Sequence, residues 1–119
     1  MARFYACLAA GGAFEGSRIL AESTIETATS LQTEVAADPT LGVPRRYALG
    51  FVLGGTVPDD KGTTAPADAF GHGGFGSSIG WADPGLDLAF SYVTNGLRDT
   101  YEQVVRAATM ADTVRSSVR

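Results

Sequence analysis

The chain has 119 residues, of which 45% are hydrophobic and 18% charged, so it can form one folded domain but not two, and it is not disordered. Its net charge of −4, with no basic stripe, argues against nucleic acid as the main partner. No apolar run approaches the ~20 residues of a membrane span, and a single cysteine, Cys7, excludes an internal disulfide.

The N-terminal segment has the pattern of a helix. Its apolar residues recur on one helical face, at Met1, Phe4, Tyr5 and Leu8. Gly11-Gly12 then predicts the C-terminus of the helix, and Cys7 is expected to be a buried, inert thiol. The same run is at the lower limit for a signal peptide, so a helix and a cytoplasmic location are favoured. The helix would begin at Met1 without an N-cap.

The next segments predict a short turn or extended piece, a helix, a loop and a strand. Residues 16–20 form the turn, and Ser23-Thr24-Ile25-Glu26 has the pattern of a capping box that opens a helix. Apolar residues continue at helical spacing to Val35, and the helix should end before Asp38-Pro39 because the residue before a proline avoids the helical region. After a loop over residues 36–45, large and small residues alternate from Tyr47 to Leu53, which predicts a strand.

The second half predicts two more strands and a final helix. Residues 54–69 are typical of a surface loop, with Asp59-Asp60-Lys61 as its solvated tip. Strands are predicted over residues 77–82 and 86–94, separated by the turn Asp83-Pro84-Gly85. Asp99-Thr100-Tyr101-Glu102 opens the last helix in the manner of a capping box.

The predicted strands separate large from small side chains. The large ones share one face: Phe51, Ile79, Trp81, Leu88, Phe90 and Tyr92. The small ones share the other: Gly50, Ser78, Gly80, Ala89 and Ser91. A small face lets a helix approach closely, and the large face must also be covered. The pattern predicts an α+β fold (an α/β sandwich fragment) with an antiparallel sheet of about three strands and the C-terminal helix packed on it. The short N-terminal helices leave part of the sheet uncovered.

Several of the 15 glycines cluster around the only histidine, His72. Residues 71–76 match G-x-G-x-x-G, but a loop precedes the motif and a strand-like segment follows it, which argues against a dinucleotide site. His72 is either a turn residue or a polar group at the mouth of a site, where backbone N–H groups could hold an oxyanion. A single histidine without carboxylates at ligand spacing argues against a metal, and no cofactor is expected. Ser77 and Ser78 lack the nucleophile-elbow context and are expected to be packing residues.

Three blocks of sequence carry a resemblance to a known family: residues 70–78 (FGHGGFGSS), 80–84 (GWADP) and 90–95 (FSYVTN). Together they resemble the C-terminal part of the beta-lactamase-related serine hydrolases, which include class C beta-lactamases, penicillin-binding proteins and esterases. Residues 1–12, 19–24 and 47–51 look like the segments that precede these strands, so the resemblance covers nearly the whole chain.

The resemblance implies roles for four residues. His72-Gly73-Gly74 would replace the family's Lys-Thr-Gly on the strand at the edge of the site. His72 would then act at the substrate carbonyl, Gly73 and Gly74 would contact the substrate, and the Phe75 N–H would be an oxyanion donor. In the parent enzyme the substrate would be a small-molecule ester or lactam.

The resemblance also implies that reactive parts of the family's site are missing. The family's Ser-x-x-Lys is absent, because the only lysine is Lys61 and Pro58 stands three residues before it. The Tyr-x-Asn motif is absent too. We therefore expect residues 1–119 to be the C-terminal part of such a domain, of the esterase type in its parent and inactive alone. The alternative is a non-catalytic binding or assembly module that pairs with a separate N-terminal half.

Overall fold

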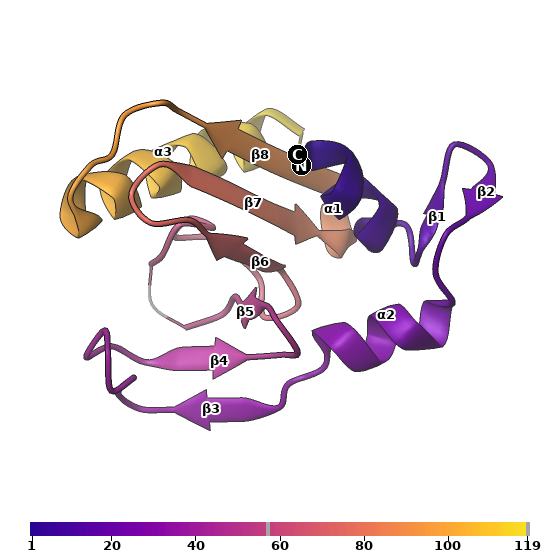
Figure 1. Ribbon diagram of the computed structural model, residues 1–119, viewed down its shortest axis with the longest axis horizontal. Helices are drawn as coiled ribbons and strands as arrows, with labels where there is room; N and C mark the ends of the chain where they lie inside the picture. The colour runs from indigo at the N-terminus through magenta and orange to yellow at the C-terminus, as the bar shows by residue number, and fades with distance from the viewer. Residues whose placement is uncertain (57, 119) are drawn as a thin grey trace.

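The computed structural model describes residues 1–56 and 58–118 and contains helices on both faces of a sheet (Figure 1). Its described helices are α1 (Ala2–Ala9), α2 (Glu22–Thr29), the 3-10 turn η1 (Pro84–Leu86) and α3 (Thr100–Val118). Its described strands are β1 (Ala13–Phe14), β2 (Ser17–Arg18), β3 (Thr33–Val35), β4 (Arg45–Tyr47), β5 (Val52–Leu53), β6 (Phe70–Gly73), β7 (Ser78–Asp83) and β8 (Leu88–Val93). No helix of the described part combines the length and the apolar character that crossing a membrane requires.

The strands β3 to β8 form one antiparallel sheet whose spatial order follows the chain, and β1 and β2 form a separate hairpin. The α+β fold and the position of the C-terminal helix on the sheet are confirmed. The sheet has six strands rather than about three, because β3, β4, β5 and β6 join the two predicted C-terminal strands. Those two strands are the longest in the sheet, and they pair over six positions.

The division into small and large faces is confirmed for β7 and β8, and a different helix covers each face (Figure 1). It is wrong for Phe51, which packs against Tyr5 on the α1 side because the chain reverses direction at Gly50. On the small face α1 packs so closely that a Cβ on Gly80 would lie 2.3 Å from the Tyr5 ring. On the large face the buried side chains Ile79 and Trp81 pack against Ala107 of α3. The small residues of α3 therefore let the large residues of the sheet fill the space beneath it.

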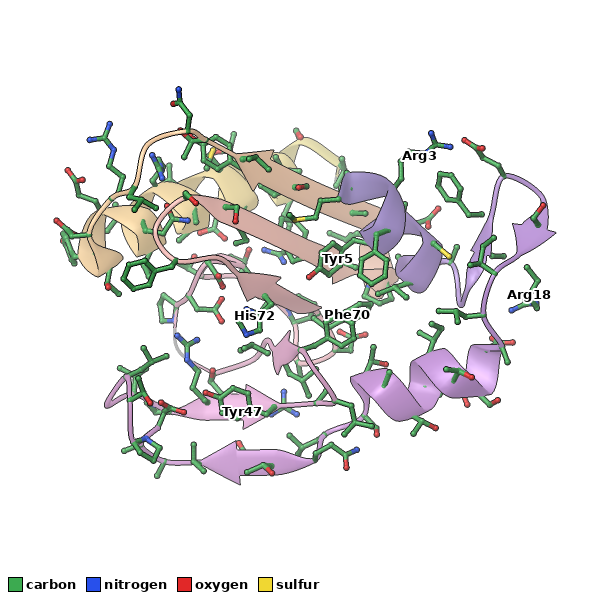
Figure 2. The ribbon with its side chains drawn as sticks, in the orientation of Figure 1. Arg3, Tyr5, Arg18, Tyr47, Phe70 and His72 are labelled. Carbon is green, nitrogen blue, oxygen red and sulfur yellow. The ribbon has the colours of Figure 1, made fainter. Side chains whose placement is uncertain are left out.

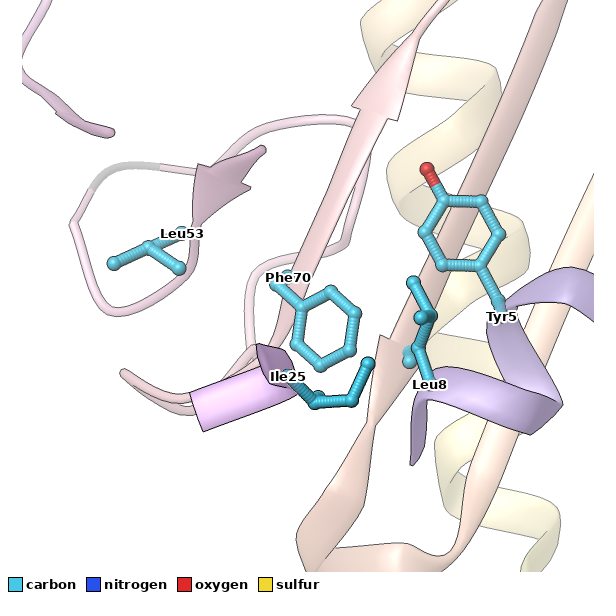
Figure 3. Close-up of a cluster of buried hydrophobic side chains, with 6 residues drawn as sticks. Tyr5, Leu8, Ile25, Leu53 and Phe70 are labelled. Carbon is cyan, nitrogen blue, oxygen red and sulfur yellow. The ribbon is translucent and has the colours of Figure 1, made fainter. Parts of the chain in front are cut away.

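A second cluster of apolar side chains ties the N-terminal helices to the sheet (Figure 3). It comprises Tyr5, Leu8, Ile25, Leu53, Phe70 and Ala82. These residues come from α1, α2, β5, β6 and β7, so the cluster fixes where β6 lies relative to both N-terminal helices. The position of β6 matters because this strand carries His72.

The prediction for the second helix is wrong at both ends. Its N-cap is Ala21, which makes no side-chain cap hydrogen bond, so Ser23 lies inside the first turn and the capping box does not form. The helix ends at Thr29, and residues 33–35 pair with β4 as a strand. Pairing between distant segments therefore outweighs the helical spacing of the apolar residues.

The single strand predicted from Tyr47 to Leu53 is also wrong, because the segment folds back on itself as a hairpin. Tyr47 pairs with Val52 across a turn in which Gly50 has a φ of 82°. The Ala48 N–H donates to the Phe51 carbonyl at 2.9 Å and closes the turn. Alternation of large and small residues continues through the two arms of a tight hairpin, so it does not reveal the turn.

Candidate active site

A groove of about 460 Å³ lies at the end of β6. Its walls come from the β4–β5 hairpin, the loop at Asp60 and the first turns of α3, and its floor includes His72 and the glycines that follow. Figure 2 shows His72 on β6 and Tyr47 on β4, and β5 lies between these two strands in the sheet. The groove therefore brings together segments that are far apart in the sequence.

The imidazole of His72 lies at the surface, where β6 pairs with β7. Its Nδ1 is 2.7 Å from the Gly73 carbonyl oxygen. In the neutral ring this contact places the proton on Nδ1, and Nε2 is left as a hydrogen-bond acceptor. The fixed tautomer gives the groove one imidazole nitrogen that can accept a proton or a hydrogen bond.

Two N–H groups after His72 differ in their hydrogen bonding. The Gly74 N–H donates to the Ser78 carbonyl at 2.7 Å. The Phe75 N–H donates to no acceptor within residues 1–56 and 58–118, and the Phe75 side chain is 91% exposed. A backbone N–H without a partner beside a groove can stabilise a developing oxyanion.

The glycines of this segment lie in close contact with their neighbours, and the backbone contact and positive φ at Gly76 require a glycine there. A Cβ on Gly74 would lie 2.2 Å from the Ser78 hydroxyl, and one on Gly76 would lie 2.4 Å from the Arg98 carbonyl oxygen. Gly76 also has a φ of 69°, in the left-handed region. The structure thus brings the four predicted site residues, His72, Gly73, Gly74 and Phe75, to one groove; their roles stay predictions.

The prediction that Asp59-Asp60-Lys61 forms a solvated tip is wrong. Asp59 and Lys61 are 2% and 0% exposed. The Lys61 ammonium lies 2.5 Å from the Asp59 carboxylate, and the Arg45 guanidinium reaches the same carboxylate at 3.1 Å. A buried charge needs such partners, and here Arg45 comes from a distant strand, so no local signal predicts the arrangement. Asp60, which sequence reasoning missed, lines the groove.

Four ionisable groups in or near the groove have shifted pKa values. Burial raises the pKa of Asp60, although the nearby Lys61 ammonium counteracts the rise. Burial also raises the pKa of the Tyr5 phenol. The Tyr47 hydroxyl donates to Asp38 at 2.6 Å, and this hydrogen bond lowers the pKa of Asp38 and raises that of Tyr47.

The chain belongs to the beta-lactamase family, since the family model described as Beta-lactamase matches residues 1–115. It is similar to the esterase/beta-lactamase LipL of Mycobacterium tuberculosis, with 35% identity over 100 residues. The match covers 82% of this chain and 21% of LipL.

Solved structures show the same relationship. A family VIII carboxylesterase is 30% identical with a TM-score of 0.69, and a penicillin-binding protein homologue from Caulobacter crescentus is 27% identical with a TM-score of 0.71. Each match covers 92% of this chain and 30% of the other. The resemblance to beta-lactamase-related hydrolases and esterases is therefore confirmed. The chain spans about a fifth of the curated relative and under a third of these two structures.

Proposed function

We propose that this chain forms the C-terminal wall of the active site of a beta-lactamase-like serine hydrolase that acts on a small-molecule ester. The observation that carries the proposal is the groove in which His72 lies beside the free Phe75 N–H. Two of the proteins similar to this chain, LipL and the family VIII carboxylesterase, are named as esterases, and this favours an ester over a lactam.

The proposed reaction is acyl transfer through a serine ester. The nucleophilic serine hydroxyl adds to the ester carbonyl, the alcohol leaves, and water then hydrolyses the acyl-serine. The Phe75 N–H donates to the carbonyl oxygen as it becomes an oxyanion. His72 contacts the carbonyl region through Nε2, and the bare backbone of Gly73 and Gly74 lets the substrate approach.

The nucleophile must come from outside this sequence, because the 119 residues contain no Ser-x-x-Lys. Exposed apolar side chains beside the groove support the proposal that another part of the hydrolase completes the site. Phe75, Leu41 and Tyr101 are 91%, 48% and 79% exposed, which is high for large apolar side chains. We propose that the rest of the hydrolase covers them and that the chain alone has no esterase activity.

The first experiment measures p-nitrophenyl butyrate hydrolysis by the purified chain. The expected rate equals that of buffer. Turnover by the purified chain that His72→Ala abolishes would overturn the proposal that the chain is inactive alone.

The second experiment uses a hybrid enzyme in which this chain replaces the matching segment of LipL. We expect the hybrid to hydrolyse p-nitrophenyl butyrate and His72→Ala to lower its kcat. Phe75→Pro deletes the backbone N–H and should lower kcat by about 100-fold or more, whereas Phe75→Ala keeps the N–H and should stay within about threefold. Equal rates for the two Phe75 variants, both folded by circular dichroism, would contradict the oxyanion role. Gly96→Ala is the matched control, since a Cβ there meets nothing within 4 Å.

The second candidate function is a module that pairs with a separately encoded N-terminal half. The same exposed apolar side chains favour it. Co-expression with such a half should then give a stable complex, while a chain that stays monomeric and melts cooperatively would count against it. An in-frame Ser-x-x-Lys in the DNA upstream of the Met1 codon would favour the single-chain enzyme instead.

A further inference from the structure

Asp60 occupies the space that a side chain at Gly73 would need. A Cβ built on Gly73 would lie 2.2 Å from Asp60 Oδ2 and 3.4 Å from Asp60 Cγ. The next atom, the Ser78 carbonyl oxygen, is 4.0 Å away, and Gly73 does not have a positive φ. A methyl group at position 73 would therefore meet the Asp60 carboxylate first and would have to displace it.

The loop that carries Asp60 is fixed to the C-terminal helix. The Asp112 carboxylate of α3 accepts hydrogen bonds from the Thr63 and Thr64 N–H groups at 2.9 and 3.2 Å, and from both hydroxyls. Arg115 of α3 donates to the Lys61 carbonyl. These bonds hold the backbone at Lys61 and at the two threonines that follow it, and they fix the loop on the C-terminal side of Asp60.

Charge holds the Asp60 side chain within the loop. The Lys61 ammonium, which is 1% exposed, lies 2.5 Å from Asp59 and 3.8 Å from Asp60. Asp60 itself accepts no hydrogen bond from the described residues, and its side chain is 21% exposed toward the groove. Packing against Gly73 and attraction to Lys61 therefore keep the carboxylate in place.

We propose that Asp60 is a positioning residue that sets where the backbone of Gly73, Gly74 and Phe75 lies. The inference rests on the proposed function, because Asp60 would affect catalysis by setting where the Phe75 N–H lies. The carboxylate supports β6 from the α3 side, where the missing side chain of Gly73 leaves a gap. A displacement of about 1 Å in a group that must meet the reacting atoms can lower a rate about 100-fold.

The test is a double-mutant cycle between Asp60 and Gly73 in the hybrid enzyme. Gly73→Ala should lower kcat at least about tenfold with little change in KM, because its methyl collides with the carboxylate. In the Asp60→Ala background, Gly73→Ala should lower kcat less than about twofold. Asp60→Ala alone should lower kcat about tenfold, while Asp60→Asn keeps the shape and should stay within about threefold. Gly96→Ala is again the control.

A second measurement uses the isolated chain and does not depend on activity. Amide signals of Gly73, Gly74 and Phe75 in ¹H–¹⁵N NMR spectra should shift in Asp60→Ala and stay near their wild-type positions in Asp60→Asn and Gly96→Ala. An equal cost of Gly73→Ala with and without the carboxylate, or unmoved amides in Asp60→Ala, would overturn the inference. A hybrid without any activity would refute the proposed function instead, and the amide shifts would still decide the role of Asp60.

Discussion

The buried pair of Arg115 and Asp83 offers a sharp test of what holds α3 to the sheet. Both side chains are almost fully buried, and the Arg115 Nε donates to the Asp83 carboxylate at 2.8 Å. The guanidinium also lies 4.3 Å from the centroid of the Trp81 ring. Arg115→Met keeps much of the volume but leaves the Asp83 charge buried without its partner. We expect it to lower the free energy of unfolding by about 3–5 kcal/mol.

That loss is a large part of the stability of a domain, which is typically about 5–15 kcal/mol. Urea unfolding measures it, followed by circular dichroism and by the fluorescence of Trp81, the only tryptophan. Agreement between the two probes checks that unfolding is two-state. Arg3→Met is the matched control, because the ion pair of Arg3 with Glu15 is exposed and should contribute less than about 1 kcal/mol.

The double variant Arg115→Met with Asp83→Asn separates the ion pair from simple packing. The double variant should lose about 1–3 kcal/mol less unfolding free energy than the two single variants lose in sum. Additive effects, or a loss in Arg115→Met no larger than in Arg3→Met, would refute the reasoning that the buried charge dominates the cost.

Three further predictions follow from other contacts. Gly80→Ala should lower the free energy of unfolding, measured by urea, by about 1–3 kcal/mol because its methyl meets the tyrosine of α1. Gly96→Ala should leave the free energy of unfolding unchanged. For Asp112, burial acts to raise the pKa, but four threonine hydrogen bonds outweigh it and leave the pKa below 3.8. Its stabilisation is thus present above about pH 4 and lost as the pH falls through the folded-state pKa, so Asp112→Asn should flatten the acid side of the stability curve; parallel curves would contradict this. Tyr47→Phe should raise the pKa of Asp38, as measured by carboxyl ¹³C NMR, and an unmoved pKa would show that the hydroxyl is not its main influence.

The elements that the sequence predicted well are those whose pattern is long and local. The helix α1 ends at glycines with positive φ, as the Gly11-Gly12 pair indicates. The start of α3 is confirmed too, since the Asp99 carboxylate accepts the Glu102 N–H at 2.9 Å. The region from α2 to β5 was predicted poorly, because β3, β4 and β5 are strands of two or three residues. Such short strands depend on their partners rather than on their own periodicity.

The candidate site divides in the same way. The segment from His72 to Phe75 is contiguous, so its glycines and its histidine could be recognised in the sequence and expected at one place. Strand β6 itself was expected only from the family resemblance, because Phe70-Gly71-His72-Gly73 is short and two of its four residues are glycines, which are rare in strands. Arg45, Tyr47 and Asp60 reach the groove through the sheet order and the loop, which no local pattern encodes.

The loop at Asp59-Asp60-Lys61 shows why composition misleads at such a position. Three consecutive charged residues between Pro58 and Gly62 are typical of a solvated turn. Their burial depends on Arg45, which neutralises Asp59 from one side, and on Arg115 and Asp112, which bind the loop from α3 more than 40 residues later. The same bonds give the loop two attachments, one to α3 and one to Arg45 of β4, which also lines the groove. A change in the C-terminal half of α3 should therefore alter the groove, although α3 contributes only its first turns to the groove wall.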